Sequence, residues 1–369
     1  MNKITIREVV SKSEMRDFVQ LPKRIYADNP CYVPDLDSDM EALCRKAKTF
    51  VAYDEKGEAV GRVATFISEK ANAKWQRKAA RFSYIDFIDD REVSAALMGA
   101  VEEWAASQGM ETVMGPLGWY DLDKEGLLVE GFDKMGAITE YYNASYYHQH
   151  LEALGYTKEV DWVQTRMAIP TEVPKTYFRV SRYVESALGL KVRKLTNKEM
   201  LEGGYGLKIL DLVNECYDSL FGYTKMSQER SLKYIKRYLP LVDLDMIPVV
   251  MDPEGNVVAA CVTMTSLSKA MRKAGGKLLP FGWWHLLKAL KWGREDTVQL
   301  LLIAVRPDMQ GYGVSAMLFD DLIPIFNKKG YKWAETGPQL DYNSKELTQW
   351  KPLNPEVVKR RRCYKKEIR

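Results

Sequence analysis

Residues 298–327 constrain the fold of this chain more than any other stretch, because they combine a strand, a turn and a helix. An apolar run of strand length, residues 298–305, ends before Pro307, since proline cannot donate a hydrogen bond to a sheet. Gly311 and Gly313 mark a turn, and apolar residues then recur at helical spacing: Met317, Leu318, Leu322 and Phe326. A helix is therefore expected to open near Tyr312.

A helix that follows a glycine turn is suited to bind an anion. Its first backbone N–H groups have no partner inside the helix, and the peptide dipole places positive charge there. Two common phosphate patterns are missing, because neither Gly-Lys-Ser/Thr nor GxGxxG follows the strand. The turn therefore predicts either another kind of phosphate cradle or a plain strand-to-helix connection.

The pattern Gln310-x-x-Gly313-x-Ser315, directly after the strand, resembles the acetyl-CoA pyrophosphate loop of the GNAT N-acetyltransferase superfamily. Ser315 departs from that pattern, which has Gly or Ala at this position. The resemblance implies acetyl-CoA or another acyl-CoA as co-substrate and no metal. It also implies that Asn343, at the start of a later helix, lies near the pantetheine. The coenzyme-binding residues implied in this way are Ile303, Ala304, Val305, Gln310, Gly311, Tyr312, Gly313, Val314, Ser315 and Asn343.

The chain of 369 residues is long enough for two domains, and its expected elements follow one order twice. In the first half, strands are expected at 4–9, 49–53, 59–67, 82–88, 112–114, 157–162 and 164–169, and helices at 13–26, 91–108 and 143–154. In the second half, strands are expected at 190–195, 246–251, 257–264, 298–305, 332–336 and 360–368, and helices at 197–217, 227–238, near 312–327 and from Asn343 toward Trp350.

The order β-α-β-β-β-α-β-α-β is the ground plan of the GNAT fold. The resemblance therefore implies an α/β chain (α+β, with a mixed sheet) built from two GNAT-like acyl-CoA N-acyltransferase domains in tandem. We expect an N-terminal lobe at 1–170, a linker with a bridging helix at 171–189 and a C-terminal lobe with the coenzyme site at 190–369. The first lobe should lack the coenzyme loop, because Asp89 and Asp90 precede its helix and would repel a pyrophosphate.

Composition predicts an ordinary globular protein of the cytoplasm. Hydrophobic residues make up 46% and charged residues 28%, and the net charge of +4 is too small to indicate nucleic-acid binding. The five cysteines have no CxxC or Cys/His ligand spacing, so neither a disulfide framework nor a zinc site is expected. The N-terminal residues contain no apolar run of signal-peptide length.

Acyl transfer from a thioester to an amine also needs groups that move protons. Some GNAT members carry a catalytic Glu on the fourth strand, where this chain has Gln299. The remaining base candidates are Glu295, Asp296 and Glu335, or a chain of water molecules. The candidate acids for the thiolate are Tyr342 and Tyr364. We favour Tyr364, Glu335 and Tyr342, although the glutamate also fits a paired surface carboxylate and the tyrosines also fit a core.

Residues 266–294 form an insert where the fold normally has a tight connection. The insert mixes cations with tryptophans and other apolar residues, and we expect it to cover the acceptor site, to lie on an anionic membrane surface as peripheral contact, or to bind an acidic acceptor. A helical hairpin that packs its tryptophans is the structural alternative. Its cations are Lys269, Arg272, Lys273, Lys277, Lys288, Lys291 and Arg294.

Two functions from different classes follow. The first is an N-acyltransferase that moves acetyl from acetyl-CoA to the amine of a small-molecule or aminoacyl acceptor. The second is a non-catalytic GNAT-like protein that binds a ligand or partner between its lobes, as the missing Glu at position 299 indicates. Nucleic acid is not expected as a partner, although the basic run at 359–362 leaves it as a weaker third hypothesis.

Overall fold

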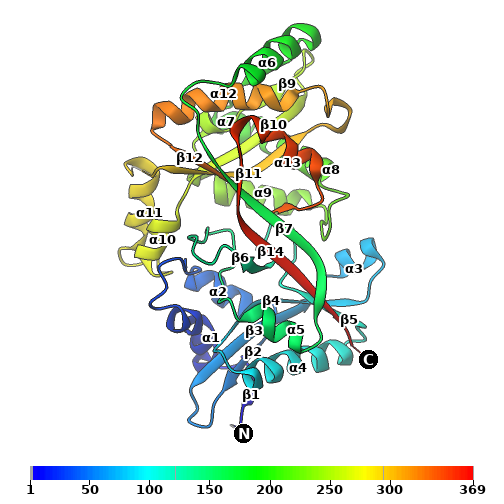
Figure 1. Cartoon of the computed structure of the whole chain (residues 1–369), viewed down its shortest axis with the longest axis vertical. Coiled ribbons are helices and arrows are strands. Elements are labelled where there is room, and N and C mark those ends of the chain that lie inside the picture. The colour runs from blue at the N-terminus through cyan, green and yellow to red at the C-terminus, as the bar shows by residue number, and fades with distance from the viewer. Residues whose placement is uncertain (1–2, 121, 294, 369) are drawn as a thin grey trace. The chain divides into compact units, whose positions relative to one another are not determined.

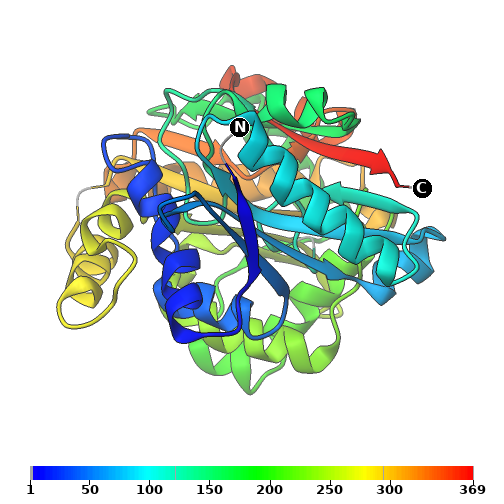
Figure 2. The same ribbon diagram turned by 90° about the horizontal axis from the view of Figure 1, so that it is seen from below.

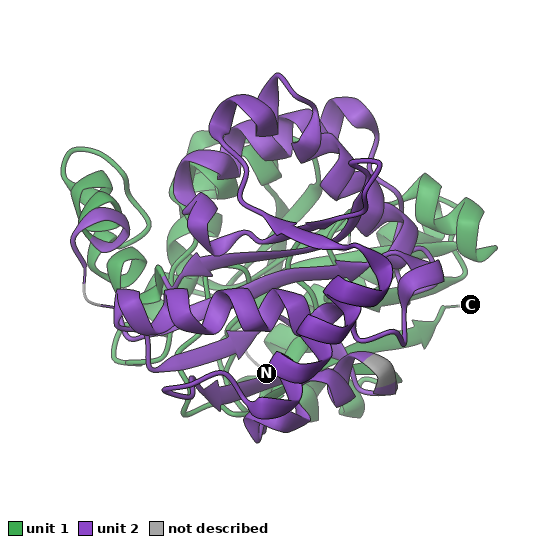
Figure 3. Cartoon of the chain, turned by 90° about the horizontal axis from the view of Figure 1, so that it is seen from above, with its two compact units in different colours: residues 1–163, 267–288, 358–369 green, residues 164–266, 289–357 purple. Residues whose placement is uncertain are grey.

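A computed structural model describes residues 3–120, 122–293 and 295–368 and divides the chain into two compact units. Unit 1 comprises residues 1–163, 267–288 and 358–369, and unit 2 comprises residues 164–266 and 289–357 (Figure 3). The first stretch of unit 1 therefore ends at residue 163, near the expected boundary at 170. Unit 1 also takes in two later stretches, 267–288 and 358–369, that the expected boundaries give to the C-terminal lobe.

Unit 1 is built on a mixed sheet in the order β1-β2-β3-β4-β5-β14. Its strands are antiparallel except for β4 and β5, which are parallel neighbours joined by helix α4. Its strands are β1 (Thr5–Glu8), β2 (Lys48–Tyr53), β3 (Ala59–Ile67), β4 (Ala79–Phe87), β5 (Thr112–Gly115), β6 (Leu127–Glu130) and most of β14 (Glu356–Glu367). Its helices are α1 (Lys12–Ile25), α2 (Asp37–Cys44), α3 (Glu69–Trp75), α4 (Arg91–Ser107), α5 (Tyr147–Ala153) and α10 (Ser268–Ala274).

Unit 2 repeats this plan with the sheet order β7-β12-β11-β10-β9-β8, in which β11 and β12 are the parallel pair. Its strands are the second part of β7 (Thr157–Ala168), β8 (Lys191–Arg193), β9 (Val249–Met251), β10 (Val257–Thr265), β11 (Thr297–Val305), β12 (Trp333–Thr336) and β13 (Gln339–Leu340). Its helices are α6 (Lys175–Leu188), α7 (Asn197–Leu201), α8 (Tyr205–Cys216), α9 (Gln228–Tyr238), α12 (Val314–Lys329) and α13 (Ser344–Gln349). Helix α11 (Gly282–Lys291) continues from unit 1 into unit 2.

Two long strands, labelled β7 and β14 in Figure 1, begin in one unit and end in the other. Strand β7 pairs Ala168 with Trp333 in unit 2, and β14 pairs Tyr364 with Gly115 in unit 1. The two strands expected at 157–162 and 164–169 are thus one continuous strand, and the last strand of the chain completes the sheet of unit 1.

Local chemistry explains several boundaries of the helices. Helix α1 begins at Lys12, one residue before the expected start. Its N-cap is Ser11, because the Ser11 hydroxyl accepts from the Glu14 N–H at 3.2 Å while the Glu14 carboxylate accepts from the Ser11 N–H at 2.9 Å. The helix expected at 197–217 is split into α7 and α8, since Gly204 adopts φ of +73°. The helix expected at 143–154 covers only Tyr147–Ala153.

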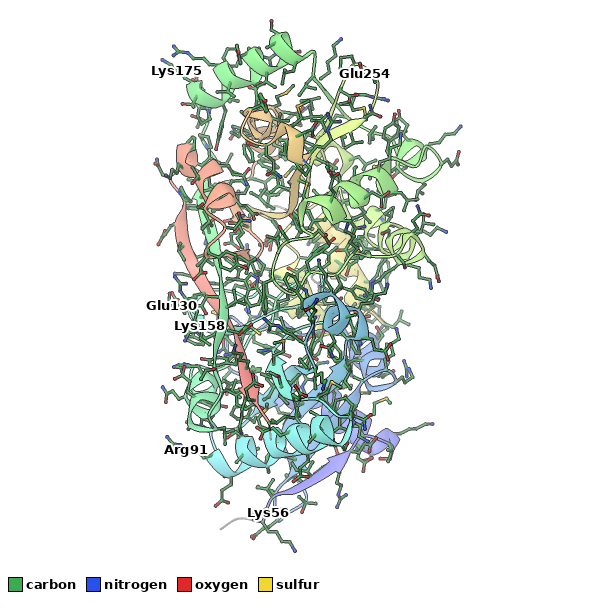
Figure 4. All side chains as sticks on the ribbon, turned by 90° about the vertical axis from the view of Figure 1, so that its right-hand side faces the viewer. Lys56, Arg91, Glu130, Lys158, Lys175 and Glu254 are labelled. Atoms are coloured by element: carbon green, nitrogen blue, oxygen red, sulfur yellow. The ribbon has the colours of Figure 1, made fainter. Side chains whose placement is uncertain are left out.

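Each unit has its own apolar core. In unit 2 the four residues that predicted the helix from their spacing, Met317, Leu318, Leu322 and Phe326, are all buried, which confirms the periodicity. Helix α6, which begins at Lys175 (Figure 4), buries Tyr177 and Val184 in the same core. No helix in the described residues is both long enough and apolar enough to cross a bilayer.

Candidate functional site

The candidate site lies where β11 passes into α12, entirely within unit 2. A short 3-10 turn, Pro307–Met309, follows the strand, and Gly313 is the N-cap of α12. The helix begins at Val314, two residues after the expected Tyr312. Gly311 and Gly313 have φ of +88° and +85°, a region that costs other residues strain. The two glycines therefore shape the loop that the sequence singled out.

The loop offers backbone donors that nothing else uses. Among the described residues, no oxygen accepts a hydrogen bond from the N–H groups of residues 311–315; the first N–H of this region with a partner is that of Ala316, which donates to the Gly313 oxygen at 2.9 Å. Tyr312 is 61% exposed, and Gly311 is exposed as well. An open row of amides at the positive end of a helix dipole favours a phosphate group.

Arg306, just before the loop, pairs with two carboxylates. Asp308, in the 3-10 turn, accepts from Arg306 Nε at 2.7 Å, and Asp252 accepts from Arg306 Nη1 at 3.4 Å. The Arg306 guanidinium lowers the pKa of Asp308, whereas hydrogen bonds from Asn256, followed by Arg306, lower the pKa of Asp252 against the effect of desolvation. Both carboxylates are thus paired, which reduces their repulsion of an anion at the loop.

Gly313 is required for packing as well as for its backbone angle. A Cβ at this position would stand 2.4 Å from Val180 Cγ1 of α6, whereas a Cβ on Gly311 would meet nothing within 4 Å. Helix α6 is fixed to α12 by the Ser181 hydroxyl, which donates to Asp320 at 2.8 Å. The segment expected as a linker is therefore a packed helix that supports the loop from behind.

Strands β11 and β12 separate beside the loop. They pair only from Thr297 to Leu300, so the edge of β11 beyond Leu300 is not covered by β12. Because Arg306 donates to Val258 of β10 and alternate residues face the same edge, Ile303 and Val305 turn their backbone groups to the open edge. By the same alternation Ala304 faces β10, with which it pairs, so its expected backbone role is corrected.

Side chains occupy part of this open edge. The Tyr217 hydroxyl donates to the Ile303 oxygen at 3.0 Å and accepts from the Ile303 N–H at 3.4 Å. The Val305 oxygen accepts from Gln310 Nε2 at 3.0 Å and from Cys216 Sγ at 3.1 Å. A ligand that pairs with this strand must take the place of the Tyr217 hydroxyl.

The expected proton-transfer residues fall in different places. Glu335 accepts from Gln299 Nε2 at 3.1 Å and lies 3.6 Å from Arg166 Nε, so it is a paired carboxylate. Tyr342 is 61% exposed, and partial desolvation raises its pKa. Tyr364 belongs to unit 1, where it is buried and donates to Glu152 at 2.9 Å. Its surroundings are those of a core tyrosine, which is the alternative that the sequence left open for Tyr364.

Glu346 on α13 is the acid–base candidate that sequence reasoning missed. Its Oε1 accepts from Gln339 Nε2 at 2.7 Å and its Oε2 accepts from Asn343 Nδ2 at 3.0 Å. Burial raises the pKa of this carboxyl. A desolvated carboxylate of raised pKa is suited to accept a proton. The sequence signal that could have indicated Glu346 is its position three residues after Asn343, at the start of a helix.

The corresponding turn of unit 1 is closed. The Asp90 carboxylate caps α4 by accepting from the Glu92 N–H at 2.8 Å, and Asp89 lies 3.0 Å from His150 Nε2. An acidic side chain thus occupies the helix start that would hold a phosphate.

Comparison with known proteins identifies the architecture. No protein-family model matches the chain. A tandem GNAT protein from the clavulanic acid biosynthesis pathway, in a structure without AcCoA, covers 100% of this chain and 99% of its own, with a TM-score of 0.59 at 11% identity. The chain has the tandem GNAT fold. Within this tandem GNAT fold, an open glycine loop follows the fourth strand in unit 2, whereas Asp90 closes the same turn in unit 1.

Two curated proteins are similar over almost the whole length. Protein YghO from Escherichia coli (strain K12) is 26% identical over 381 residues, which cover 98% of this chain and 95% of that protein. The bacterial ceramide synthase from Caulobacter vibrioides (strain NA1000 / CB15N) is 24% identical over 357 residues, which cover 94% of this chain and 90% of that protein.

Proposed function

We propose that this protein is an acyl-CoA-dependent N-acyltransferase with one donor site, in unit 2. The observation that carries the proposal is the open row of N–H groups at residues 311–315, at the start of α12 and beside the uncovered edge of β11. A diphosphate matches the amides, and an extended chain with amide groups matches a strand edge.

The proposed donor pose uses both features. The pyrophosphate lies on the loop from Gln310 to Ser315, and the pantetheine follows the backbone of Ile303 and Val305 toward Asn343 and α13. Tyr217 must release Ile303 for this to happen. The amide of one pantetheine unit would then replace the two hydrogen bonds of the tyrosine hydroxyl.

The proposed chemistry is direct transfer. The amine nitrogen attacks the thioester carbonyl carbon, the C–N bond forms, and the C–S bond breaks with its electron pair leaving on sulfur. The amine loses one proton, for which Glu346 is the first candidate and Glu335 the second. The thiolate gains one proton, for which Tyr342 is the candidate donor. Glu346 is ranked before Glu335 because burial raises the pKa of Glu346, which makes it the stronger base.

The curated relative from Caulobacter supports N-acylation and indicates a class of acceptor. A ceramide is a long-chain amino alcohol acylated on its nitrogen, so we propose a long-chain amine as acceptor. The donor is an acyl-CoA, with acetyl-CoA as the smallest form to be tested beside long-chain forms.

A calorimetric titration with coenzyme A tests the donor site. Gly311→Glu places a carboxylate in open space at the loop, so it should weaken binding at least tenfold without a steric clash. Gly311→Gln carries the same backbone strain without the charge and should bind like the wild type. Gly330→Glu puts the same strain and charge at the far end of α12, where φ is +82° and the space is also open. Equal affinity in all four proteins would reject the site.

The second candidate is a non-catalytic binding protein. Gln299 cannot take a proton, and Tyr217 covers the strand edge that a thioester would use. Release of free coenzyme A thiol from acyl-CoA in the presence of long-chain amines separates the two functions. Binding without amine-dependent thiol release would favour the binding protein.

A further inference from the structure

Within the insert, residues 266–293 form two helices, α10 and α11, and the turn that follows α10 is anchored to unit 1. In sequence the insert lies between β10 and β11 of unit 2, but residues 267–288 group with unit 1. The Gly275 oxygen accepts from Lys23 Nζ at 2.8 Å, and the Gly276 oxygen accepts from the Asp37 N–H at 2.8 Å. Figures 1 and 2 show α10 and α11 next to each other in yellow. The insert therefore presents a defined surface.

That surface exposes large apolar side chains in one stretch. The exposed fractions are 78% for Leu279, 75% for Phe281, 63% for Trp292, 46% for Trp283, 46% for Trp284 and 37% for Leu278. Elsewhere in the described residues, large exposed apolar side chains are scattered singly or in pairs along the chain. A concentration of this kind marks an interaction surface.

The aromatic side chains of the insert are held in place. The Trp283 indole Nε1 donates to the Pro280 oxygen at 3.0 Å, and its ring meets the Trp284 ring edge to face with centroids 5.8 Å apart. Tryptophan combines a large apolar ring with a polar N–H, which suits the boundary between headgroups and hydrocarbon.

The charge of the insert has one sign. Residues 266–293 contain no Asp or Glu, and six cations in this stretch are exposed: Lys269, Arg272, Lys273, Lys277, Lys288 and Lys291. Arg294 lies outside the described residues. Exposed cations beside exposed aromatic residues complement a surface that is anionic outside and apolar beneath.

We propose that the face formed by residues 277–292 docks this protein onto an anionic lipid bilayer. Leu279, Phe281 and the tryptophans enter the interface, while the lysines lie among the anionic headgroups. The proposal does not depend on the proposed acyl transfer, because its test contains no coenzyme. Docking at a bilayer would place the protein where long-chain amines reside.

Vesicle sedimentation of the full chain tests the docking. We expect binding to vesicles in which about a third of the lipid is phosphatidylglycerol, a loss of binding as salt is raised, and little binding to phosphatidylcholine alone. Bound protein should show a blue shift of tryptophan fluorescence. No sedimentation with the anionic vesicles at low salt would overturn the proposal.

Matched variants assign the binding to this face. The double variant Leu279→Ser with Phe281→Ser should reduce the vesicle partition coefficient at least tenfold, and Lys277→Glu with Lys288→Glu should do the same only at low salt. The control, Val10→Ser with Tyr183→Ser, removes side chains that are 80% and 72% exposed elsewhere and should bind like the wild type. All these side chains are exposed, so thermal unfolding should be unchanged.

A competing occupant of the face is a second copy of the chain. Analytical ultracentrifugation without lipid distinguishes it. A dimer that Leu279→Ser with Phe281→Ser dissociates would overturn the membrane assignment, as would equal vesicle binding by that variant and its control.

Discussion

Tyr217 determines whether the strand edge at the candidate site is open. Its hydroxyl meets both backbone groups of Ile303, and the loop after α8 is held by Asn214, whose side-chain oxygen accepts from Tyr223 at 2.8 Å and from the Met226 N–H at 2.9 Å. The tyrosine thus makes the same pair of hydrogen bonds that an amide ligand would make.

Replacing Tyr217 by Phe should therefore strengthen coenzyme A binding, by threefold to tenfold, while the fold loses about 1 kcal/mol. The physical reason is that the variant leaves the Ile303 groups without an internal competitor. Titration with 3′-phosphoadenosine diphosphate, which lacks the pantetheine, should give the wild-type affinity. Weaker coenzyme binding by the variant would show that the tyrosine supports the donor instead.

Glu346→Gln should lower kcat by about 10²- to 10⁴-fold with little change in KM, because the proposed base is lost. Glu335→Gln is the matched control on β12 and should retain most of the activity. The wild-type rate should rise with pH through a pKa above the ordinary glutamate value, as burial of Glu346 requires. A larger effect at Glu335 would reverse the two assignments.

Stability gives a second test of Glu346. Its pKa is raised in the folded state, so between the unfolded pKa near 4.5 and the folded pKa the native protein holds more protons than the unfolded chain. Rising pH therefore removes stability in that window, at up to about 1.4 kcal/mol per pH unit. Urea unfolding of Glu346→Gln should show a shallower fall than the wild type over the same pH range.

For individual residues, the sequence predicted those of the loop and missed those around it. Gln310, Gly311 and Gly313 lie next to one another in the chain, so their spacing could be read directly. Tyr217, directly after α8, reaches Ile303 only through tertiary packing, and Glu346 on α13 was recognised only from its contacts with Gln339 and Asn343. The same packing placed Tyr364 in the other unit, which no local pattern could indicate.

Helix α6 is the element on which the loop depends. The sequence predicted a bridging helix within the linker at 171–189, because Pro170 and Pro174 are typical of linkers. No pattern in the sequence indicated which surface this helix covers. In the structure Val180 fills the space beside Gly313.

A double-mutant cycle measures this packing. Gly313→Ala should cost about 1–2 kcal/mol for its backbone angle, and the contact with Val180 should add about 1–3 kcal/mol. In a Val180→Ala background the contribution of this contact should vanish, which gives a coupling free energy of about 1–3 kcal/mol. Gly311→Ala carries the backbone cost alone and serves as the control. If the effects of Gly313→Ala and Val180→Ala on the free energy of unfolding were additive, the two positions would not interact.

For the molecule as a whole, the two units exchange stretches of chain. The sequence predicted the repeated order of elements, since each element has its own periodicity. It could not predict that residues 364–367 pair with residues 112–115, because any exposed strand edge would satisfy the same alternating pattern. The expected domains, 1–170 and 190–369, are each one continuous stretch of sequence. The two units are not, because unit 1 also contains residues 267–288 and 358–369.

Arg361→Met tests the contribution of β14 to unit 1. The Arg361 guanidinium is 0% exposed and donates to Glu140 at 2.9 Å, and Lys359 donates to the same carboxylate at 3.0 Å. Loss of one partner from a buried pair costs about 3–5 kcal/mol, and the lower end is expected because Lys359 remains. In hydrogen-exchange measurements, the backbone amides of β5 and β6 in unit 1 should lose protection first. Equal loss of protection in β10 and β11 would show that the units unfold together.

The exchanged last strand also affects synthesis. All residues of unit 2 have left the ribosome once residue 357 has emerged. Unit 1, which holds the N-terminus, still lacks β14, the sixth strand in the order of its sheet. The half that is translated first is therefore completed last, and until then the outer edge of β5 lacks the strand that pairs with it.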